Sequence, residues 1–283
     1  MTEIAGKAAV VTGGGSGIGE ALCIELAAAG ARVVVADIIG EKAQAVADGI
    51  RAGGGDAIAV SVDVCERAAI RTLKETANAV FGPIQLLFAN AGATSFERLT
   101  AMSDEDVDWL FQVNLMGVVY SLQVFLPEMI AAGDGHVVAT ASTSGLLPGW
   151  VPSQSCYAST KMGIIGMIFN LRYELGLHGV GASVLCPGPT STSMKDNNGL
   201  YRPARFGGPT AGPVVLPTEF TSDPNQNLNF RMPEDVARMT LRAVRDDFPL
   251  IVLDAADRAQ FERTYLDVVN EAFDRAAQFA GQA

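Results

Sequence analysis

The chain has 283 residues, of which 49% are hydrophobic, a formal net charge of −11 and four cysteines. This length and apolar content are enough for one large globular domain with a sizeable core. The acidic charge repels nucleic-acid phosphates and anionic membranes, so neither is an expected partner. The cysteines form no CxxC pair and the two histidines join no Cys/His cluster, so we expect neither a disulfide framework nor a metal site.

The N-terminal stretch MTEIAGKAAVVTGG has no charged region followed by a long apolar run. Along the rest of the chain, no unbroken apolar run is long enough to cross a bilayer. Both observations predict a soluble, cytoplasmic protein.

From residue 7 onward, short β-branched runs alternate with longer amphipathic runs. Strands are predicted over residues 8–12, 31–37, 57–64, 84–90, 136–142, 182–187 and 249–254. Helices are predicted over residues 17–30, 41–54, 67–82, 103–133, 155–178, 233–247 and 258–279. This alternation indicates βαβ units, in which nearly continuous apolar strands are buried on both faces. The expected fold class is α/β: a Rossmann-like, doubly wound parallel sheet with helices on both faces.

The regular pattern breaks after Thr190, where Pro, Gly and Asn become frequent. A long segment of this kind in a compact domain predicts a substrate-loop insertion at about 190–232. Five apolar side chains in it could close over a hydrophobic substrate, or pin the loop to the protein or to another subunit: Tyr201, Phe206, Leu216, Phe220 and Phe230. A C-terminal helical extension is expected at about 256–280. The whole chain, 1–283, is interpreted as one Rossmann-like domain without a linker.

A glycine-rich turn, TGGGSGIG, lies between the first strand and the first helix. Its glycines do not match the spacing GxGxxG in any register; the pattern is instead Gly13, Gly17 and Gly19. Backbone rich in glycine can approach a pyrophosphate closely, and the N–H groups at the start of a helix face its charge. The turn therefore predicts a dinucleotide site, and the alternative is a tight strand-to-helix turn that binds nothing.

Asp37 ends the second predicted strand, 18 residues beyond Gly19. An acidic side chain at this place can accept hydrogen bonds from an adenosine ribose, and it would repel a 2′-phosphate. Because the neighbouring positions Ser16, Glu20 and Ile38 carry no arginine, NAD is favoured over NADP as the cofactor. The alternative is a carboxylate that merely caps the next turn.

Polar or small residues also end the third and fourth predicted strands. These are Asp63-Val64 and Asn90-Ala91-Gly92. Ligands of doubly wound sheets bind outside the carboxyl ends of the strands, so these residues suit the same site.

Tyr157 and Lys161 stand four residues apart in SCYASTKMGIIGMIFNL, and this spacing places them on one face of a helix. A phenol is a poor base at neutral pH, but a nearby cation favours the phenolate and lowers its pKa. Such a tyrosine can exchange a proton with an alcohol or a carbonyl oxygen. The pair therefore predicts interconversion of an alcohol and a carbonyl compound. The alternative is an ordinary helix with a buried tyrosine and a lysine that reaches solvent.

Taken together, these motifs resemble the short-chain dehydrogenase/reductase family from about residue 5 to residue 195. The resemblance rests on TGGGSGIG, Asp37, Asp63-Val64, the NAG triplet at 90–92, Asn114, Ser142, YASTK and PGPTST. Each motif is weak alone, but their joint order is specific.

The resemblance implies that Tyr157 is the general acid/base and that Lys161 tunes it and binds the nicotinamide ribose. It further implies that Ser142 holds the substrate oxygen and that Asn114 supports a water in a proton relay from Lys161. The implied cofactor-binding residues are Gly13, Ser16, Gly17, Ile18, Gly19, Asp37, Asp63, Val64, Asn90, Ala91, Gly92, Tyr157, Lys161, Pro187, Gly188, Thr190 and Thr192. A homotetramer or homodimer built on the long helices around 103–131 and 155–178 is implied as well.

Two positions depart from the family pattern. The usual spacing from the active-site serine to the tyrosine points to Ser144, whereas the register against Gly145 favours Ser142. Ala89 stands where the family often has a second asparagine. Of the other conspicuous residues, Trp150 could line a substrate pocket or pack its loop, and His136 is expected at the solvent edge.

The sequence therefore predicts an NAD-dependent oxidoreductase that acts on a small-molecule secondary alcohol or ketone, and the apolar residues of the long loop are compatible with a bulky apolar substrate. The alternatives are a catalytically silent NAD-binding regulator, or another reaction, such as epimerisation or dehydration, on the same scaffold.

Overall fold

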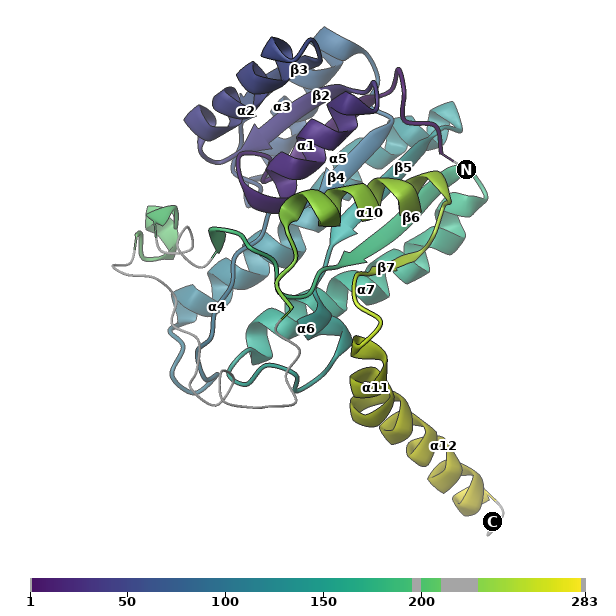
Figure 1. Cartoon of the computed structure of the whole chain (residues 1–283). Helices are drawn as coiled ribbons and strands as arrows, with labels where there is room; N and C mark the ends of the chain where they lie inside the picture. The colour runs from purple at the N-terminus through teal and green to yellow at the C-terminus, as the bar shows by residue number, and fades with distance from the viewer. Residues whose placement is uncertain (1, 195–199, 210–228, 281–283) are drawn as a thin grey trace.

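Figure 1 shows the computed structural model of the chain, which describes residues 2–194, 200–209 and 229–280. Seven parallel strands form one sheet in the order β3-β2-β1-β4-β5-β6-β7. The strands are β1 (Ala8–Thr12), β2 (Arg32–Asp37), β3 (Asp56–Ser61), β4 (Leu86–Ala89), β5 (Gly135–Thr140), β6 (Val180–Cys186) and β7 (Leu250–Val252). The predicted doubly wound parallel sheet is confirmed. Its strand order reverses between β1 and β4, the place where such sheets open a binding crevice.

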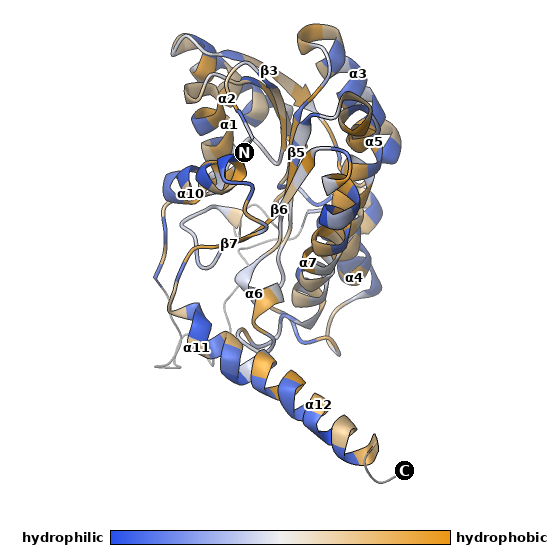
Figure 2. Ribbon diagram, turned by 90° about the vertical axis from the view of Figure 1, so that its right-hand side faces the viewer, coloured by the Kyte–Doolittle hydropathy of each residue, from blue (hydrophilic) through white to orange (hydrophobic). Residues whose placement is uncertain are grey.

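Six helices cover the two faces of this sheet (Figure 2). They are α1 (Gly17–Ala28), α2 (Gly40–Ala52) and α10 (Pro233–Arg245) on one face, and α3 (Arg67–Phe81), α5 (Gly117–Ala132) and α7 (Ser155–Gly176) on the other. Successive strand residues serve opposite cores: Val10 packs with the α3, α5 and α7 layer, and Val11 with the α1, α2 and α10 layer. Both strand faces are therefore buried, as the continuous apolar runs predict.

The helical stretch Asp104–Ala132 combines α4 (Asp104–Phe111), the π-helical turn η1 (Gln112–Met116) and α5. By length and composition alone it is long and apolar enough to cross a bilayer, although polar residues such as Asn114 and Gln123 interrupt it. The apolar side chains have another explanation, because α5 packs against β4, β5 and α3 and buries Leu122 and Phe125 there.

Part of the predicted loop insertion docks on α4. Arg202 forms an ion pair with Asp106 and lies over the Trp109 ring, at 5.2 Å from its centroid. Phe206, in the short 3-10 helix η2 (Ala204–Phe206), is buried in a small cluster that includes Trp109. The alternative in which these side chains pin the loop to the protein is thus realised at Phe206. Leu216 and Phe220 lie outside the described residues.

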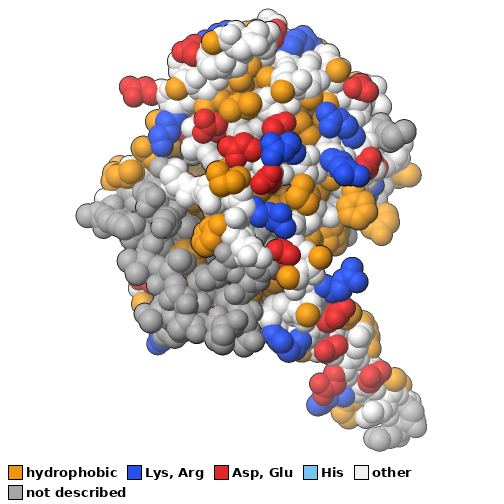
Figure 3. Space-filling model, viewed as in Figure 1, with side chains coloured by type: hydrophobic (Ala, Val, Ile, Leu, Met, Phe, Trp, Pro, Cys, Tyr) orange, Lys and Arg blue, Asp and Glu red, His pale blue; other side chains and the backbone are white. Residues whose placement is uncertain are grey.

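The predicted C-terminal helix is present and projects from the body as an arm (Figures 1 and 3). It consists of α11 (Asp257–Phe261), the π-helical turn η3 (Glu262–Leu266) and α12 (Asp267–Ala280). No side chain of α12 is buried, and Phe273 and Phe279 are more than two-thirds exposed.

The expectation that His136 lies at the solvent edge is wrong. It is the second residue of β5, and its side chain is fully buried. One ring nitrogen lies 3.0 Å from Oγ1 of Thr2 and the other 2.9 Å from Oγ of Ser183. The chain from Thr2 onward folds over the amino edge of the sheet and encloses this histidine, a long-range contact that local sequence does not reveal.

Candidate active site

A cavity of about 820 Å³ runs along the carboxyl edge of the sheet. All but two of the residues predicted for catalysis or cofactor binding line it, including Asp37, Ser142, Tyr157 and Lys161. The exceptions are Gly19 and Asn114, which lie behind its wall. The predicted residues thus meet at one site although the outermost of them, Gly13 and Thr192, are 179 positions apart in the sequence.

The glycine turn forms one end of the cavity and is too crowded for side chains. Gly13 and Gly17 have φ angles of +65° and +56°, in the left-handed region that favours glycine. A Cβ on Gly19 would lie 1.9 Å from the Gly13 carbonyl oxygen, so the first turn of α1 packs directly on the backbone of the loop. A Cβ on Gly17 would lie 3.0 Å from Thr192. This arrangement leaves backbone exposed to the cavity, which fits the close approach of a pyrophosphate.

Asp37 fixes the turn as well as facing the cavity. Its Oδ2 accepts a hydrogen bond from the Gly15 N–H, at 2.9 Å, and its Oδ1 accepts one from the Ile39 N–H, also at 2.9 Å. The proposed turn-capping role of this carboxylate is therefore present. It does not exclude the ribose-binding role, because each carboxylate oxygen has a second lone pair and Asp37 lines the cavity.

Asn90 connects three strand ends. Its Nδ2 donates to the carbonyl oxygen of Thr12 at 3.2 Å, and its Oδ1 accepts from the Thr140 hydroxyl at 3.1 Å. The Thr12 hydroxyl oxygen in turn accepts hydrogen bonds from the N–H groups of Asn90 and Ala91. β1, β4 and β5 are therefore locked together at the switch point of the sheet, which makes the floor of the cavity rigid.

Asp63 is engaged by a residue that the sequence did not single out. Strand β3 ends at Ser61, so Asp63 follows the strand instead of ending it. Its Oδ2 accepts a hydrogen bond from Arg205 at 2.7 Å, and the same guanidinium lies 3.3 Å from Glu66. The loop segment that carries Arg205 is thereby tied to the nucleotide end of the cavity. Of these three residues, only Asp63 was singled out from the sequence.

Tyr157, Lys161 and Ser142 lie together on the wall of the cavity. Both Tyr157 and Lys161 are buried on α7, and the Lys161 Nζ lies 5.7 Å from the centroid of the Tyr157 ring. The Lys161 ammonium donates to the Thr140 carbonyl oxygen at 2.9 Å. The Ser142 side chain is close enough to Tyr157 to act on the pKa of the phenol as a hydrogen-bond partner.

Burial dominates the electrostatics of this group. It raises the pKa of Tyr157, while the hydrogen bond with Ser142 acts in the opposite direction. Burial also lowers the pKa of Lys161 to about 8, against an opposing effect of Cys186. The expectation that Lys161 brings the Tyr157 pKa below its ordinary value is thus not met by this group of side chains, because burial raises that pKa more than the hydrogen-bond partner Ser142 lowers it. At neutral pH the phenol is protonated and the lysine is charged.

Asn114 lies in the π-helical turn η1, a distortion frequent at functional sites. Its side chain is fully buried and pairs with the backbone of Ala93, accepting from the N–H at 2.8 Å and donating to the carbonyl oxygen at 3.0 Å. A Cβ on Gly92 would lie 3.2 Å from the Asn114 Oδ1 and 3.4 Å from the Lys161 Nζ. Asn114 and Lys161 therefore approach the same side of Gly92, and the role of Asn114 in a water relay stays a prediction.

The two candidate serines differ in their partners. Ser142 precedes the short helix α6 (Thr143–Leu146), accepts a hydrogen bond from the Ser144 N–H at 3.1 Å and contacts Tyr157. The Ser144 hydroxyl instead donates to Oε1 of Gln154 at 2.8 Å. The geometry favours Ser142 as the partner of the tyrosine. Trp150 is buried but does not line the cavity, so it packs its loop.

The other end of the cavity is largely apolar and aromatic. Its lining there includes Phe96, Trp109, Val113, Val151 and Phe230. Phe230 is 59% exposed, in contrast with the buried Phe206. This end has the character of a site for an organic molecule with an apolar body.

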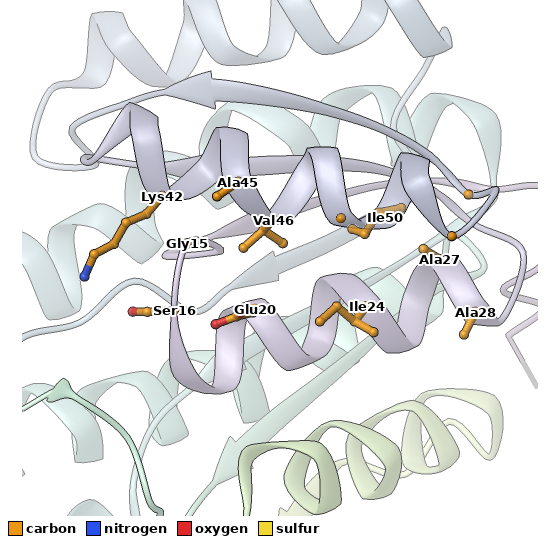
Figure 4. Close-up of a pocket in the computed structure, with 13 residues that line it drawn as sticks. Gly15, Ser16, Glu20, Ile24, Ala27, Ala28, Lys42, Ala45, Val46 and Ile50 are labelled. Carbon is orange, nitrogen blue, oxygen red and sulfur yellow. The ribbon is translucent and has the colours of Figure 1, made fainter.

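A second, shallower groove of about 690 Å³ lies between α1 and α2 (Figure 4). Ile24 and Val46 line its middle, Ala27 and Ile50 one end, and Ser16 and Lys42 the other. Figure 3 shows apolar side chains gathered on this part of the surface. The groove shares Ser16 and Lys42 with the main cavity, but its apolar middle has no side chain suited to acid/base or nucleophilic chemistry.

The fold and this edge of the sheet define a dinucleotide-binding α/β protein. Comparison with known proteins gives the family. The family model described as short chain dehydrogenase matches residues 7–201. The chain therefore belongs to the short-chain dehydrogenase/reductase family, as the motifs predict, and its relatives are oxidoreductases.

Individual relatives cover most of the chain. A C alpha-dehydrogenase from Sphingobium sp. is 28% identical over 95% of this chain and 88% of its own length. The oxidoreductase UcpA from Salmonella typhimurium is 32% identical over 70% of this chain and 74% of its own. A short chain dehydrogenase/reductase from Burkholderia phymatum, solved in complex with NAD, is 31% identical with a TM-score of 0.87 and covers 96% of this chain and 97% of its own.

Proposed function

We propose that the protein is an NAD-dependent dehydrogenase that interconverts an uncharged secondary alcohol and the corresponding ketone. The observation that carries this proposal is the placement of Ser142, Tyr157 and Lys161 together on the wall of a cavity that extends from the glycine turn to an apolar end. A regulator that only binds a dinucleotide has no need of this group.

In the reducing direction, Tyr157 donates its phenolic proton to the carbonyl oxygen of the substrate. The protonated state that burial favours is the one required. The Ser142 hydroxyl is placed to bind the same oxygen, and the Lys161 charge stabilises the phenolate that remains after transfer. In the oxidising direction the same groups act in reverse, and the phenolate accepts the proton of the alcohol.

The nicotinamide ring, when bound, supplies the hydride donor or acceptor. The residues that would hold the dinucleotide are those of the glycine turn for the pyrophosphate, Asp37 for the adenosine ribose, and the segment from Pro187 to Thr192 for the nicotinamide side. The turn that has no room for a Cβ on Gly19, and the strand ends locked by Asn90, fit such a ligand. A carboxylate at position 37 favours NAD, because it would repel a 2′-phosphate.

The substrate end supports a bulky apolar substrate. Three aromatic side chains line it, namely Phe96, Trp109 and Phe230. Closure of such side chains around a substrate excludes water from the transfer. The chain also offers a surface for self-association, since Met162, Phe169, Tyr173 and Leu177 are exposed along α7. We include a homotetramer or homodimer in the proposal.

The test is NADH formation from NAD with a panel of aliphatic, aromatic, sugar-like and steroid-like secondary alcohols. Wild type and Tyr157→Phe are run side by side, and NADH binding is measured for both. Turnover by wild type that falls by about 10³-fold or more in the variant, with NADH binding retained, supports the proposal. Equal turnover by the two proteins would refute the role of Tyr157. Binding of NADH without turnover of any alcohol would favour the regulator.

A further inference from the structure

Three buried polar side chains form a connected row on the cavity wall beside Tyr157. The Ser144 hydroxyl donates to Oε1 of Gln154 at 2.8 Å, and Nε2 of Gln154 donates to Oγ1 of Thr94 at 3.5 Å. All three line the cavity, and each is no more than 7% exposed. They come from three separate segments, so the row exists only in the folded protein.

The row retains hydrogen-bonding capacity on the cavity side. A glutamine amide has two N–H donors, and the one bond that Gln154 donates is at the long limit for a hydrogen bond. The Ser144 hydroxyl donates its one hydrogen bond to Gln154, and its oxygen keeps lone pairs that can accept further hydrogen bonds. Buried polar groups of this kind are costly unless they are fully bonded, so a ligand that completes their bonds gains affinity.

The position of the row relates it to the reacting atoms. Gln154 immediately precedes α7 and stands three residues before Tyr157, about one helical turn or 5 Å along the axis. Ser144 is joined to Ser142 through its backbone N–H, at 3.1 Å. If the reacting oxygen of the substrate is bonded to Ser142 and Tyr157, the substrate atoms next to Gln154 are therefore those close to this oxygen. The far end of the substrate molecule lies elsewhere.

The charges around the cavity limit which chemical group of the substrate can lie next to Gln154. Among the described residues that line it, the ionisable Asp37, Lys42 and Asp63 lie at the nucleotide end, and the Lys161 ammonium is bonded to Thr140. Nothing in the described lining beside Gln154 would neutralise a carboxylate or a phosphate. An uncharged group that both donates and accepts a hydrogen bond fits best, and a hydroxyl is the simplest such group.

We propose that Gln154 and Ser144, with Thr94 holding Gln154, form a subsite for a second hydroxyl of the substrate, one or two carbons from the reacting carbinol. The inference rests on the proposed function and specifies its substrate as an uncharged diol or hydroxyketone with an apolar, aromatic body. Gln154 is then the residue that distinguishes such a substrate from its mono-alcohol analogue.

The experiment compares 1-phenylpropane-1,2-diol with 1-phenylpropan-1-ol, which lacks only the second hydroxyl. The ratio of kcat/KM for diol over mono-alcohol is measured in wild type, Gln154→Leu and Ser144→Ala. Gln44→Leu, a substitution of an exposed glutamine on α2, is the matched control. The wild type is expected to prefer the diol by about tenfold or more, and both cavity variants to reduce this ratio by about tenfold, while the control keeps it.

A ratio that stays at the wild-type value in both cavity variants would overturn the subsite. So would an equal loss of activity toward both alcohols, which would mean that Gln154 only packs the start of α7. NADH binding by each variant verifies that it is folded.

A binding measurement separates failure of the subsite from failure of the proposed function. Both alcohols are titrated calorimetrically into the NADH complex of Tyr157→Phe, with and without Gln154→Leu. If the wild type oxidises neither of these alcohols nor any other alcohol of the panel, the proposed function fails. The subsite still stands if the diol binds at least about tenfold more tightly and Gln154→Leu removes the difference, and it fails if the two alcohols bind alike.

Discussion

Strand β5 has buried polar side chains at both ends, and the two groups differ in how much hydrogen-bonding capacity they leave available to a ligand. At the amino end, both ring nitrogens of His136 are hydrogen-bonded to protein hydroxyls. The Ser183 hydroxyl in turn donates a hydrogen bond to the Phe248 carbonyl oxygen, at 2.7 Å. At the carboxyl end, Thr140 and Ser142 border the cavity of about 820 Å³. A buried titratable group is therefore no sign of a site by itself, and unused bonding capacity toward a cavity is the better sign.

The strongest test of the difference between the two ends adds a side chain at the carboxyl edge of the sheet. Gly19→Ala would place a Cβ 1.9 Å from the Gly13 carbonyl oxygen, so the backbone of the turn has to move. We expect loss of measurable NADH binding and destabilisation by more than about 4 kcal/mol. Thermal unfolding and NADH titration check both effects.

A matched glycine serves as the control. Gly49 lies on α2 with nothing within 4 Å of an added Cβ, so Gly49→Ala is expected to stabilise the protein by about 0.5–1 kcal/mol and to leave NADH binding intact. Normal NADH affinity in Gly19→Ala would show that close backbone approach is not what binds the dinucleotide.

Removal of the tyrosine's partner gives the next largest effect. Ser142→Ala deletes a hydroxyl that acts on Tyr157 as a hydrogen-bond partner and is placed to bind the substrate oxygen. We expect kcat/KM to fall by about 10²–10³-fold for every substrate, with an unchanged NADH dissociation constant. Ser144→Ala is the comparison, because its effect should depend on the second hydroxyl of the substrate. The reverse result, a uniform loss in Ser144→Ala and little change in Ser142→Ala, would make Ser144 the active-site serine.

The closed cluster at the amino end should affect stability and its pH dependence. Burial lowers the pKa of His136 to about 4; Asp247, 3.9 Å away, acts in the opposite direction, and Arg172 reinforces the lowering. Below its ordinary pKa the unfolded chain binds a proton that the folded protein refuses, so stability falls as the pH drops from about 6.5 toward 4. The loss approaches about 3 kcal/mol.

Urea unfolding at several pH values between 4 and 7.5 measures this loss. His136→Asn, which does not titrate in this range, should have a flatter pH profile than wild type. Exposed His178 is the control, and His178→Asn should reproduce the wild-type profile. Parallel profiles for wild type and His136→Asn would mean that His136 is protonated in the folded protein.

The difference between the two clusters also marks how far the sequence could lead. Local patterns predicted all seven strands and placed Asp37, Asn90 and Tyr157 at one edge, because the carboxyl ends of parallel strands must meet there. They could not predict that Thr2 covers His136, since that contact spans 134 positions. The pairing of Arg205 with Asp63 across 142 positions was hidden for the same reason.

Two other features had no local signal. The π-helical turn around Asn114 continues the periodicity of its neighbours, so the sequence predicts one unbroken helix there. The bond from Ser144 to Gln154 joins residues ten apart across a loop, and neither residue type suggests the other. Periodicity thus predicts the elements and their order, while the polar contacts between loops emerge only from the folded chain.

The smallest effect concerns cofactor choice at the edge itself. Asp37→Ala removes the carboxylate that would repel a 2′-phosphate and leaves Lys42 in the lining of the same cavity. The ratio of the NADPH to the NADH dissociation constant is expected to fall by about tenfold, which corresponds to about 1.4 kcal/mol. Asp63→Asn, in which a neighbouring carboxylate paired with Arg205 loses its charge, should leave the ratio unchanged. If both variants change the ratio equally, the choice between NADH and NADPH depends on the overall acidity of the carboxyl edge. If the wild type already binds NADPH more tightly than NADH, the inference of NAD from Asp37 is wrong.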